Sequence, residues 1–231
     1  MNADALAVAG YQPFSTVDFP GQLAAVVFLQ GCPWRCGYCH NPHLQARGPG
    51  PGLRWSGLRD WLKARRGRLD AVVFGGGEPS LDPALPAALT ELRTMGYRLG
   101  LHSAGLAPRR LAALLPLLDW IGLDVKAAPS DAALYTHITG SRSAATALRA
   151  SLALLKDSGR AYEVRSTLHP RWFSDGDVLR LVEELRDAPR HALQVAQLPD
   201  VNGQLQAPQG YPSVALLTAA RAIRPDLLLR T

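Results

Sequence analysis

The sequence predicts an α/β fold in which parallel strands alternate with helices. Apolar, β-branched runs recur along the chain, segments with helical periodicity separate them, and polar residues follow almost every run. The 231 residues suit a single domain, 1–231, with a lead-in segment over residues 1–22 and βα repeats over residues 23–231.

Six runs are predicted to be strands: Leu23–Leu29, Asp70–Phe74, Tyr97–His102, Asp119–Val125, Tyr162–Thr167 and Leu193–Gln197. Helical periodicity predicts six helices: Ser56–Arg65, Ala84–Met95, Pro108–Leu118, Ala144–Lys156, Asp175–Arg186 and Ser213–Ile223. This alternation predicts parallel strands joined by right-handed crossovers. Since a complete barrel needs eight such units, the pattern fits both an open doubly wound sheet and a partial barrel.

The composition is that of an ordinary globular protein, with 47% hydrophobic and 19% charged residues. No apolar run is long enough to span a bilayer, and Met1–Gly10 does not resemble a secretion signal, so we expect a cytoplasmic protein with no membrane partner. The net charge is +6, but basic residues are scattered, with short clusters such as Arg65–Arg68. We interpret them as solvated helix faces and expect no nucleic-acid partner; a basic face for an acidic protein is the alternative.

Three cysteines, Cys32, Cys36 and Cys39, lie within eight residues directly after the first predicted strand, and the chain has no others. An odd number of cysteines cannot close a disulfide framework, so the C-x3-C-x2-C spacing indicates a shared ligand. Three thiolates can hold three corners of a 4Fe–4S cubane and leave the fourth iron open. Structural zinc is the alternative, and it would need a fourth ligand such as His40 or His43.

Polar residues gather where the predicted strands end. In both candidate folds the ligand site lies at the carboxyl ends of the strands. The residues that fall there are the three cysteines, Glu78, His102, Ser103, Asp124, Lys126, Arg165, His169 and Gln197. We therefore expect the site on this rim, and leave open whether His102, His169 and Gln197 contact the ligand.

The cysteine spacing, with an aromatic residue before the last cysteine, resembles the radical S-adenosylmethionine superfamily. Leu29–Cys32 together with Cys39–Pro42 resemble the activating enzymes of glycyl-radical enzymes, above all the activating protein of the anaerobic ribonucleoside-triphosphate reductase. The resemblance extends from Thr16–Gly21 to the sixth predicted strand. It implies a partial (β/α)6 barrel and a 4Fe–4S cluster on the three cysteines, whose open iron binds S-adenosylmethionine.

The resemblance also implies contacts to S-adenosylmethionine. They involve Tyr38 near the adenine, Gly76, Gly77 and Glu78 at the ammonium group, Ser103 on the rim, Asp124 and Lys126 beside the methionine portion, and Arg165 at the nucleoside or carboxylate end. Ordinary structural roles are the alternatives: a βα turn for the glycines, a solvated pair for Asp124 and Lys126, and a salt bridge for Arg165. Because glycine lets backbone approach a ligand closely, Gly77→Val is expected to weaken S-adenosylmethionine binding while the cluster remains.

The activity implied by the resemblance is that of a radical-generating activase. A reduced cluster would cleave S-adenosylmethionine to methionine and a 5′-deoxyadenosyl radical, which takes hydrogen from a glycine of the partner. The expected partner is the anaerobic ribonucleoside-triphosphate reductase, with a flavodoxin- or ferredoxin-type electron donor. The alternatives are an activase of pyruvate formate-lyase or another glycyl radical enzyme, a small-molecule radical enzyme of the deazapurine-synthase kind, and a zinc-binding interaction module. The lack of further cysteines for auxiliary clusters favours a protein substrate.

Overall fold

Apolar runs form the centre of one eight-stranded sheet, as the sequence predicts. In the computed structural model, which describes residues 2–48 and 53–230, these strands are β2 (Ala24–Leu29), β3 (Ala71–Gly76), β4 (Arg98–Ser103), β5 (Trp120–Asp124), β6 (Ala161–Leu168) and β7 (His191–Val195). Each pairs in parallel with the next along the chain. Parallel strands that are buried on both faces read as continuous apolar runs, which is why the sequence showed them clearly.

Two further strands form the edges of the sheet and were not predicted. β1 (Val8–Ser15) pairs antiparallel with β2, and β10 (Leu228–Arg230) pairs parallel with β7. β1 includes Gly10 and Pro13 and is exposed over its second half, so it lacks a buried strand's pattern, and β10 has only three residues.

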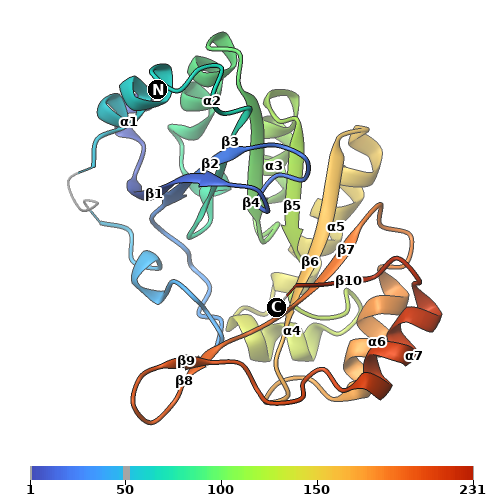
Figure 1. Ribbon diagram of the computed structural model, residues 1–231. Helices are drawn as coiled ribbons and strands as arrows, with labels where there is room; N and C mark the ends of the chain where they lie inside the picture. The colour runs from blue at the N-terminus through green and yellow to red at the C-terminus, as the bar shows by residue number, and fades with distance from the viewer. Residues whose placement is uncertain (1, 49–52, 231) are drawn as a thin grey trace.

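The strand order β1-β2-β3-β4-β5-β6-β7-β10 decides between the two candidate folds. A doubly wound sheet reverses its strand order at a switch point, whereas here neighbours in the sheet follow the chain throughout. Within the described ranges no ladder joins β1 to β10, so the curved sheet stays open (Figure 1). The fold is therefore a partial barrel, as the resemblance implies.

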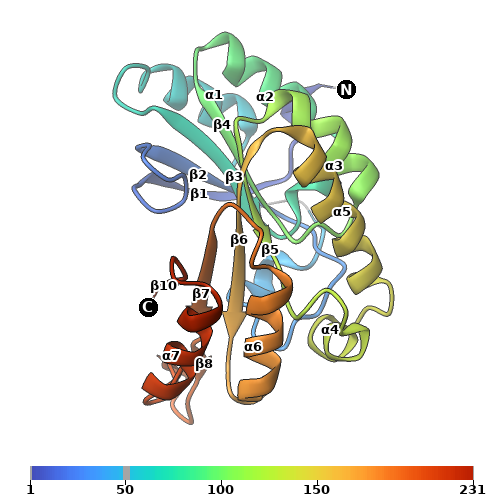
Figure 2. The same cartoon turned by 90° about the vertical axis from the view of Figure 1, so that its right-hand side faces the viewer.

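All six predicted helices are present: α1 (Trp55–Lys63), α2 (Leu85–Thr94), α3 (Pro108–Leu114), α5 (Ala144–Ser158), α6 (Asp175–Glu184) and α7 (Val214–Ile223). Figure 2 shows α1, α2, α3 and α5 side by side along the outer face of the sheet. The predicted helix Pro108–Leu118 is α-helical only to Leu114 and continues as a 3₁₀ turn that contains Pro116.

One short helix was missed. α4 (Ala132–Thr139) begins at Asp131, whose side chain accepts a hydrogen bond from the Leu134 amide, and ends at Gly140 in the left-handed region with φ 72°. It lies between β5 and α5, in a stretch for which no element was predicted. A small hairpin of β8 (Leu198–Pro199) and β9 (Leu205–Gln206) follows β7 and was also not predicted.

The two faces of the sheet differ in chemistry. The main hydrophobic core lies between the sheet and the outer helices, with Val27, Phe74 and Leu101 fully buried in it. A smaller inner cluster contains Phe19, whose ring stacks on Trp120 at 5.4 Å between centroids. Towards the carboxyl ends of the strands, polar side chains replace this inner cluster. No helix in the described ranges combines the length and hydropathy needed to cross a bilayer.

Candidate functional site

The cysteine loop, residues 31–42, leaves the end of β2 and is fixed by backbone hydrogen bonds on both sides. The Gly31 amide donates to the Leu44 carbonyl at 2.8 Å. On the other side the amides of Arg35 and Gly37 donate to the carbonyls of Thr139 and Ile138 at 3.0 and 3.2 Å. The last carbonyls of a helix have no partner within the helix, so the end of α4 supplies acceptors for this loop. The missed helix therefore positions the cysteines.

The three cysteines are free thiols, each partly buried. Burial raises the pKa of Cys32 to about 11, with smaller contributions in the same direction from Glu78, Cys36 and Cys39. Burial also raises the pKa of Cys36. Thiols in such surroundings stay protonated until a metal or cluster displaces the proton.

The donors of the loop are those of a cubane with three protein thiolates. Among the residues that the structure describes, no three or more His, Cys, Asp or Glu side chains close around one point. A tetrahedral zinc site needs four ligands that converge on one ion. A 4Fe–4S cubane does not, because each thiolate binds its own iron. Three soft thiols on one hydrogen-bonded loop therefore fit three corners of such a cluster.

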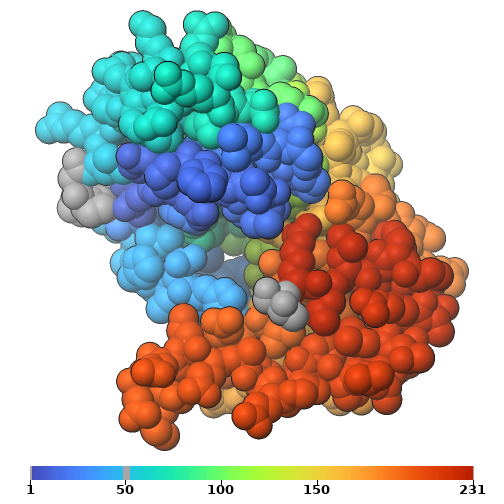
Figure 3. Space-filling model, in the orientation of Figure 1, coloured from blue at the N-terminus to red at the C-terminus, as the bar shows by residue number. Residues whose placement is uncertain are grey.

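Cavities flank the cysteine loop on two sides. One of ≈ 470 Å³ is lined by the loop from Arg35 to His40, by Gln197 and by the β8–β9 hairpin. Figure 3 shows the hollow between the region of the cysteine loop and this hairpin. The other, of ≈ 320 Å³, is lined by Cys32, Gln30 and Arg47 among others. The loop is thus open to ligands and partners, and Gln197 does lie with Cys36 and Cys39 around one cavity.

The glycine turn after β3 is packed against the start of the cysteine loop. A Cβ at Gly77 would lie 2.6 Å from the Gly31 carbonyl oxygen, and one at Gly76, where φ is 107°, would lie 2.5 Å from the Leu29 amide nitrogen. The amides of Gly77 and Glu78 donate to the carbonyls of Leu29 and Gly31. The expectation that Gly77→Val would leave the cluster intact is therefore corrected: the added carbons meet the backbone that carries Cys32.

Glu78 and Ser103 are used inside the fold. The Glu78 carboxylate is 2% exposed and accepts four hydrogen bonds, from the amide and hydroxyl of Ser80, the hydroxyl of Ser103 and the amide of Ala104. Three of these bonds end on Oε1 and one ends on Oε2, so the carboxylate is fixed inside the fold. Ser103 also accepts from the Gly105 amide. Glu78 and Ser103 thus belong to a buried network that joins the ends of β3 and β4, and their contacts to the ligand stay a prediction.

Asp124, Lys126 and Arg165 are brought together, as expected from their positions on the rim. Asp124 Oδ1 lies 3.1 Å from Arg165 Nη2, and its Oδ2 accepts from Lys126 Nζ at 3.2 Å. Burial alone would raise the pKa of Asp124, but the two cations outweigh it and lower the pKa to about 2. The Lys126 ammonium also lies 5.9 Å from the centre of the Tyr38 ring, which is 5% exposed. This group therefore joins the cysteine loop to the inner face of the sheet.

The sequence left His102 undecided and did not single out Asp18, yet both extend this polar group. His102 Nε2 lies 2.9 Å from the Asp18 carbonyl oxygen, and Arg165 Nη1 lies 3.1 and 3.3 Å from the two ring nitrogens of His102. The period-2 alternation of strands places His102, and not Ser103, on the inner face. His169 instead accepts a hydrogen bond from the Arg171 amide and packs on Trp172 in the turn after β6.

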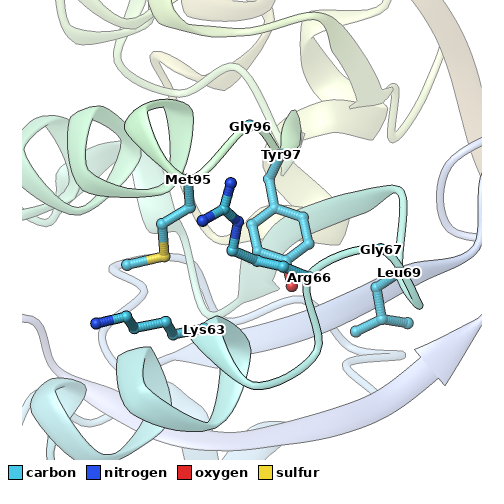
Figure 4. A pocket seen from close by; sticks show the side chains of 7 residues that line it. All are labelled: Lys63, Arg66, Gly67, Leu69, Met95, Gly96 and Tyr97. Carbon is cyan, nitrogen blue, oxygen red and sulfur yellow. The ribbon is translucent and has the colours of Figure 1, made fainter.

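A further cavity lies away from all of these residues. It has a volume of ≈ 630 Å³ and is lined by Lys63, Arg66, Gly67, Leu69, Met95, Gly96 and Tyr97 (Figure 4). These residues belong to the end of α1 and to the loops that join α1 to β3 and α2 to β4. Since folds of this type bind ligands at the carboxyl ends of their strands, this cavity is not the candidate site.

Known proteins resemble this chain in sequence and in fold. A protein of Methanocaldococcus jannaschii named as a glycyl-radical enzyme activating enzyme is 26% identical over 197 residues, which cover 81% of this chain and 78% of the relative. The pyruvate formate-lyase-activating enzyme of Staphylococcus aureus (strain USA300) is 30% identical and covers 80% of each chain.

Among solved structures, Streptococcus suis SuiB bound to the precursor peptide SuiA has a TM-score of 0.66 at 13% identity. The match covers 89% of this chain and 48% of SuiB, so this chain spans about half of that protein and shares its fold. The model of the radical SAM superfamily matches residues 26–185, which include the cysteine loop, β3 to β6 and the Asp124–Arg165 group. With a match over more than half of its length, the chain belongs to the radical SAM superfamily.

Proposed function

We propose that this protein is an activase that places a glycyl radical on a partner enzyme. The observation that carries the proposal is the cysteine loop: three free thiols held on one hydrogen-bonded loop beside the ion-paired Asp124, Lys126 and Arg165. The names of the relatives from M. jannaschii and S. aureus support the activase class. The 4Fe–4S cluster and S-adenosylmethionine are the cofactors of the superfamily.

Cys32, Cys36 and Cys39 would hold the cluster. The bound cluster would supply one electron for reductive cleavage of S-adenosylmethionine. The part of the protein is to bind and orient the substrate and to position the partner's glycine near the 5′ carbon.

The charged group beside the loop suits the amino-acid end of S-adenosylmethionine. Lys126 uses one of its ammonium protons for Asp124 and keeps others for a carboxylate, while the low pKa of Asp124 keeps it ionised beside an ammonium or sulfonium group. Tyr38, buried beside Lys126, would pack against the adenine. Gly76 and Gly77 would present backbone to the ammonium group, and Arg165 would contact the ligand or hold Asp124.

The proposed partner is the anaerobic ribonucleoside-triphosphate reductase, with a flavodoxin- or ferredoxin-type protein as electron donor. The segments Leu29–Cys32 and Cys39–Pro42 favour this partner. Pyruvate formate-lyase is a second candidate because its activating enzymes are among the relatives, at 30% identity in S. aureus. The cavity of ≈ 470 Å³ beside Cys36 and Cys39 would admit a loop of either partner.

Electron paramagnetic resonance tests both the activase activity and the identity of the partner. The cluster-loaded protein is reduced anaerobically with S-adenosylmethionine and mixed separately with the reductase and with pyruvate formate-lyase. We expect a glycyl-radical doublet on the reductase and none on a control in which its radical glycine is alanine. A doublet on pyruvate formate-lyase alone would keep the activase and change the partner. No radical on any glycyl-radical enzyme, with turnover of a small metabolite instead, would refute the activase.

A further inference from the structure

A continuous row of polar side chains crosses the inner face of the sheet and ends at the proposed S-adenosylmethionine site. It runs from the Asp18 carbonyl through His102 on β4 and Arg165 on β6 to Asp124 on β5. Asp124 then accepts from Lys126 at 3.2 Å. His102 contacts Arg165 directly and lies at the end of the row away from Lys126.

Gly122 allows His102 and Arg165 to meet across the strand between them. A Cβ at Gly122 would lie 3.0 Å from Arg165 Cζ and 3.1 Å from His102 Cδ2. These distances are shorter than ordinary carbon–carbon contacts of about 3.5–4.0 Å. A larger residue at this position of β5 would crowd both side chains, so glycine leaves room for them to touch.

The surroundings of His102 make it an acceptor for Arg165. Burial and then the nearby Arg165 charge lower the pKa of His102, so the ring is neutral at pH 7. A carbonyl can only accept a hydrogen bond, so Nε2, 2.9 Å from the Asp18 oxygen, carries the ring proton. Nδ1 is then the acceptor of the ring. Arg165 Nη1 lies 3.3 Å from Nδ1 and 3.1 Å from Nε2, and Asp18 Oδ1 lies 3.7 Å from Nδ1. Asp18 is held in turn by Ser15, whose hydroxyl donates to its carboxylate at 2.5 Å.

Arg165 is thus bound on two sides. Its Nε and Nη2 donate to Asp124 Oδ1 at 3.2 and 3.1 Å, and His102 receives Nη1. Asp124 divides its oxygens between the two cations, because Oδ2 receives Lys126. A guanidinium that lost its contact to His102 would be free to turn away from Asp124, and Asp124 and Lys126 would move with it.

We infer that His102 is a positioning residue for S-adenosylmethionine binding, which acts by holding Arg165 against Asp124 and so fixing the Asp124–Lys126 pair. The inference rests on the proposed function, in which Asp124, Lys126 and Arg165 contact S-adenosylmethionine. It adds a residue that does not itself touch the ligand.

Substitutions at His102 and Arg165, alone and combined, test this role in the cluster-loaded protein. His102→Leu removes the acceptor at similar size, and His102→Gln keeps one donor and one acceptor. We expect His102→Leu to bind S-adenosylmethionine about tenfold more weakly in equilibrium binding, the size of one lost hydrogen bond to a charged group. The KM for S-adenosylmethionine in partner-free cleavage should rise by a similar factor, with a smaller fall in kcat, and His102→Gln should recover most of the loss.

A double-mutant cycle separates positioning from packing. If His102 acts through Arg165, His102→Leu should weaken binding little further in an Arg165→Met background. Fully additive losses, equal losses in the Leu and Gln variants, or unchanged binding in a folded His102→Leu protein would each overturn the inference. Thermal midpoints show which variants are folded, and His102→Asn replaces the Leu variant if that one unfolds. Unchanged binding in Arg165→Met would instead refute the proposed ligand site itself.

Discussion

At the scale of single residues, strand alternation decides which polar side chains can serve the site. Asp124 and Arg165 are paired across β5 and β6 and both point to the inner face, where His102 meets them. Ser103, one position further along β4, points the other way and bonds to Glu78. Proximity to a strand end therefore does not by itself place a side chain in the site, because a shift of one residue moves it to the other face of the sheet.

The thiols give the most direct residue-scale prediction. Cys36→Ala should reduce iron from about four atoms per chain to near zero after anaerobic reconstitution. The two remaining thiolates cannot hold a cubane that needs three protein ligands. The fold should survive, since a partly buried thiol on a loop contributes little to the core. Iron and sulfide analysis measures the first effect, and circular dichroism with the thermal midpoint provides the control. A Cys36→Ala protein with full iron content would contradict the cluster assignment.

At the scale of elements, the site depends on contacts between segments that are distant in the sequence. The cysteine loop follows β2, yet its amides donate to the end of α4, about one hundred residues further along the chain. Hydrogen bonds from Gly77 and Glu78 continue the β2–β3 pairing beyond both strands and fix Gly31. The loop is therefore held between two elements before any ligand binds.

Gly77 tests this arrangement. Gly77→Ala places a methyl group 2.6 Å from the Gly31 carbonyl oxygen, so β3 and the cysteine loop must move apart. We expect a loss of about 1–3 kcal/mol in the free energy of unfolding, typical of overpacking, and a lower iron content.

The matched control is Gly57→Ala in α1, where an added Cβ meets nothing within 4 Å. It should be neutral or slightly stabilising, because alanine favours a helix. Denaturant unfolding and iron analysis on both variants make the comparison. Normal iron content and stability in Gly77→Ala would show that the loop tolerates the displacement.

At the scale of the whole molecule, the sheet packs helices on its outer face and keeps charge on its inner face. His191 at the start of β7 is 0% exposed, and its Nε2 lies 3.0 Å from the Ser166 hydroxyl. Burial, with a further contribution from Arg224, lowers its pKa to about 3.

This buried histidine makes stability depend on pH. Between the unfolded pKa of about 6.5 and the folded pKa of about 3, the unfolded chain binds a proton that the folded protein does not. Stability is therefore complete above pH 6.5 and falls as the pH decreases, by up to about 1.4 kcal/mol per pH unit for this one proton. His102, whose pKa is also lowered by burial, changes the stability with pH in the same direction.

Urea unfolding at pH 7 and pH 5 measures this dependence. We expect His191→Leu, whatever its stability at pH 7, to lose less stability than the wild type between the two values, by about 1–2 kcal/mol. Identical losses in the two proteins would show that His191 is not the group that titrates.

The sequence by itself determined the α/β class, six strands and six helices, the cysteine triplet, and the rim where polar residues gather. These features are local. A buried parallel strand needs an apolar run, a helix needs its periodicity, and the cysteine spacing lies within one loop. Asp124 and Lys126 could be placed on one face because alternation along a strand is a local rule. The elements β1, β10 and α4 were not predicted, because their sequences show little apolar periodicity.

The tertiary structure alone decided which of the rim residues meet. The strand order showed that the fold is a partial barrel and not a doubly wound sheet. This choice depends on which strands pair, and periodicity does not reveal the pairing. Glu78 proved to join the ends of β3 and β4 through internal hydrogen bonds, and Gly77 proved to be packed on Gly31. His102 reaches Arg165 across β5, where Gly122 leaves space between them. These outcomes depend on contacts between residues far apart in the chain, which pairing of the strands creates and local sequence does not encode.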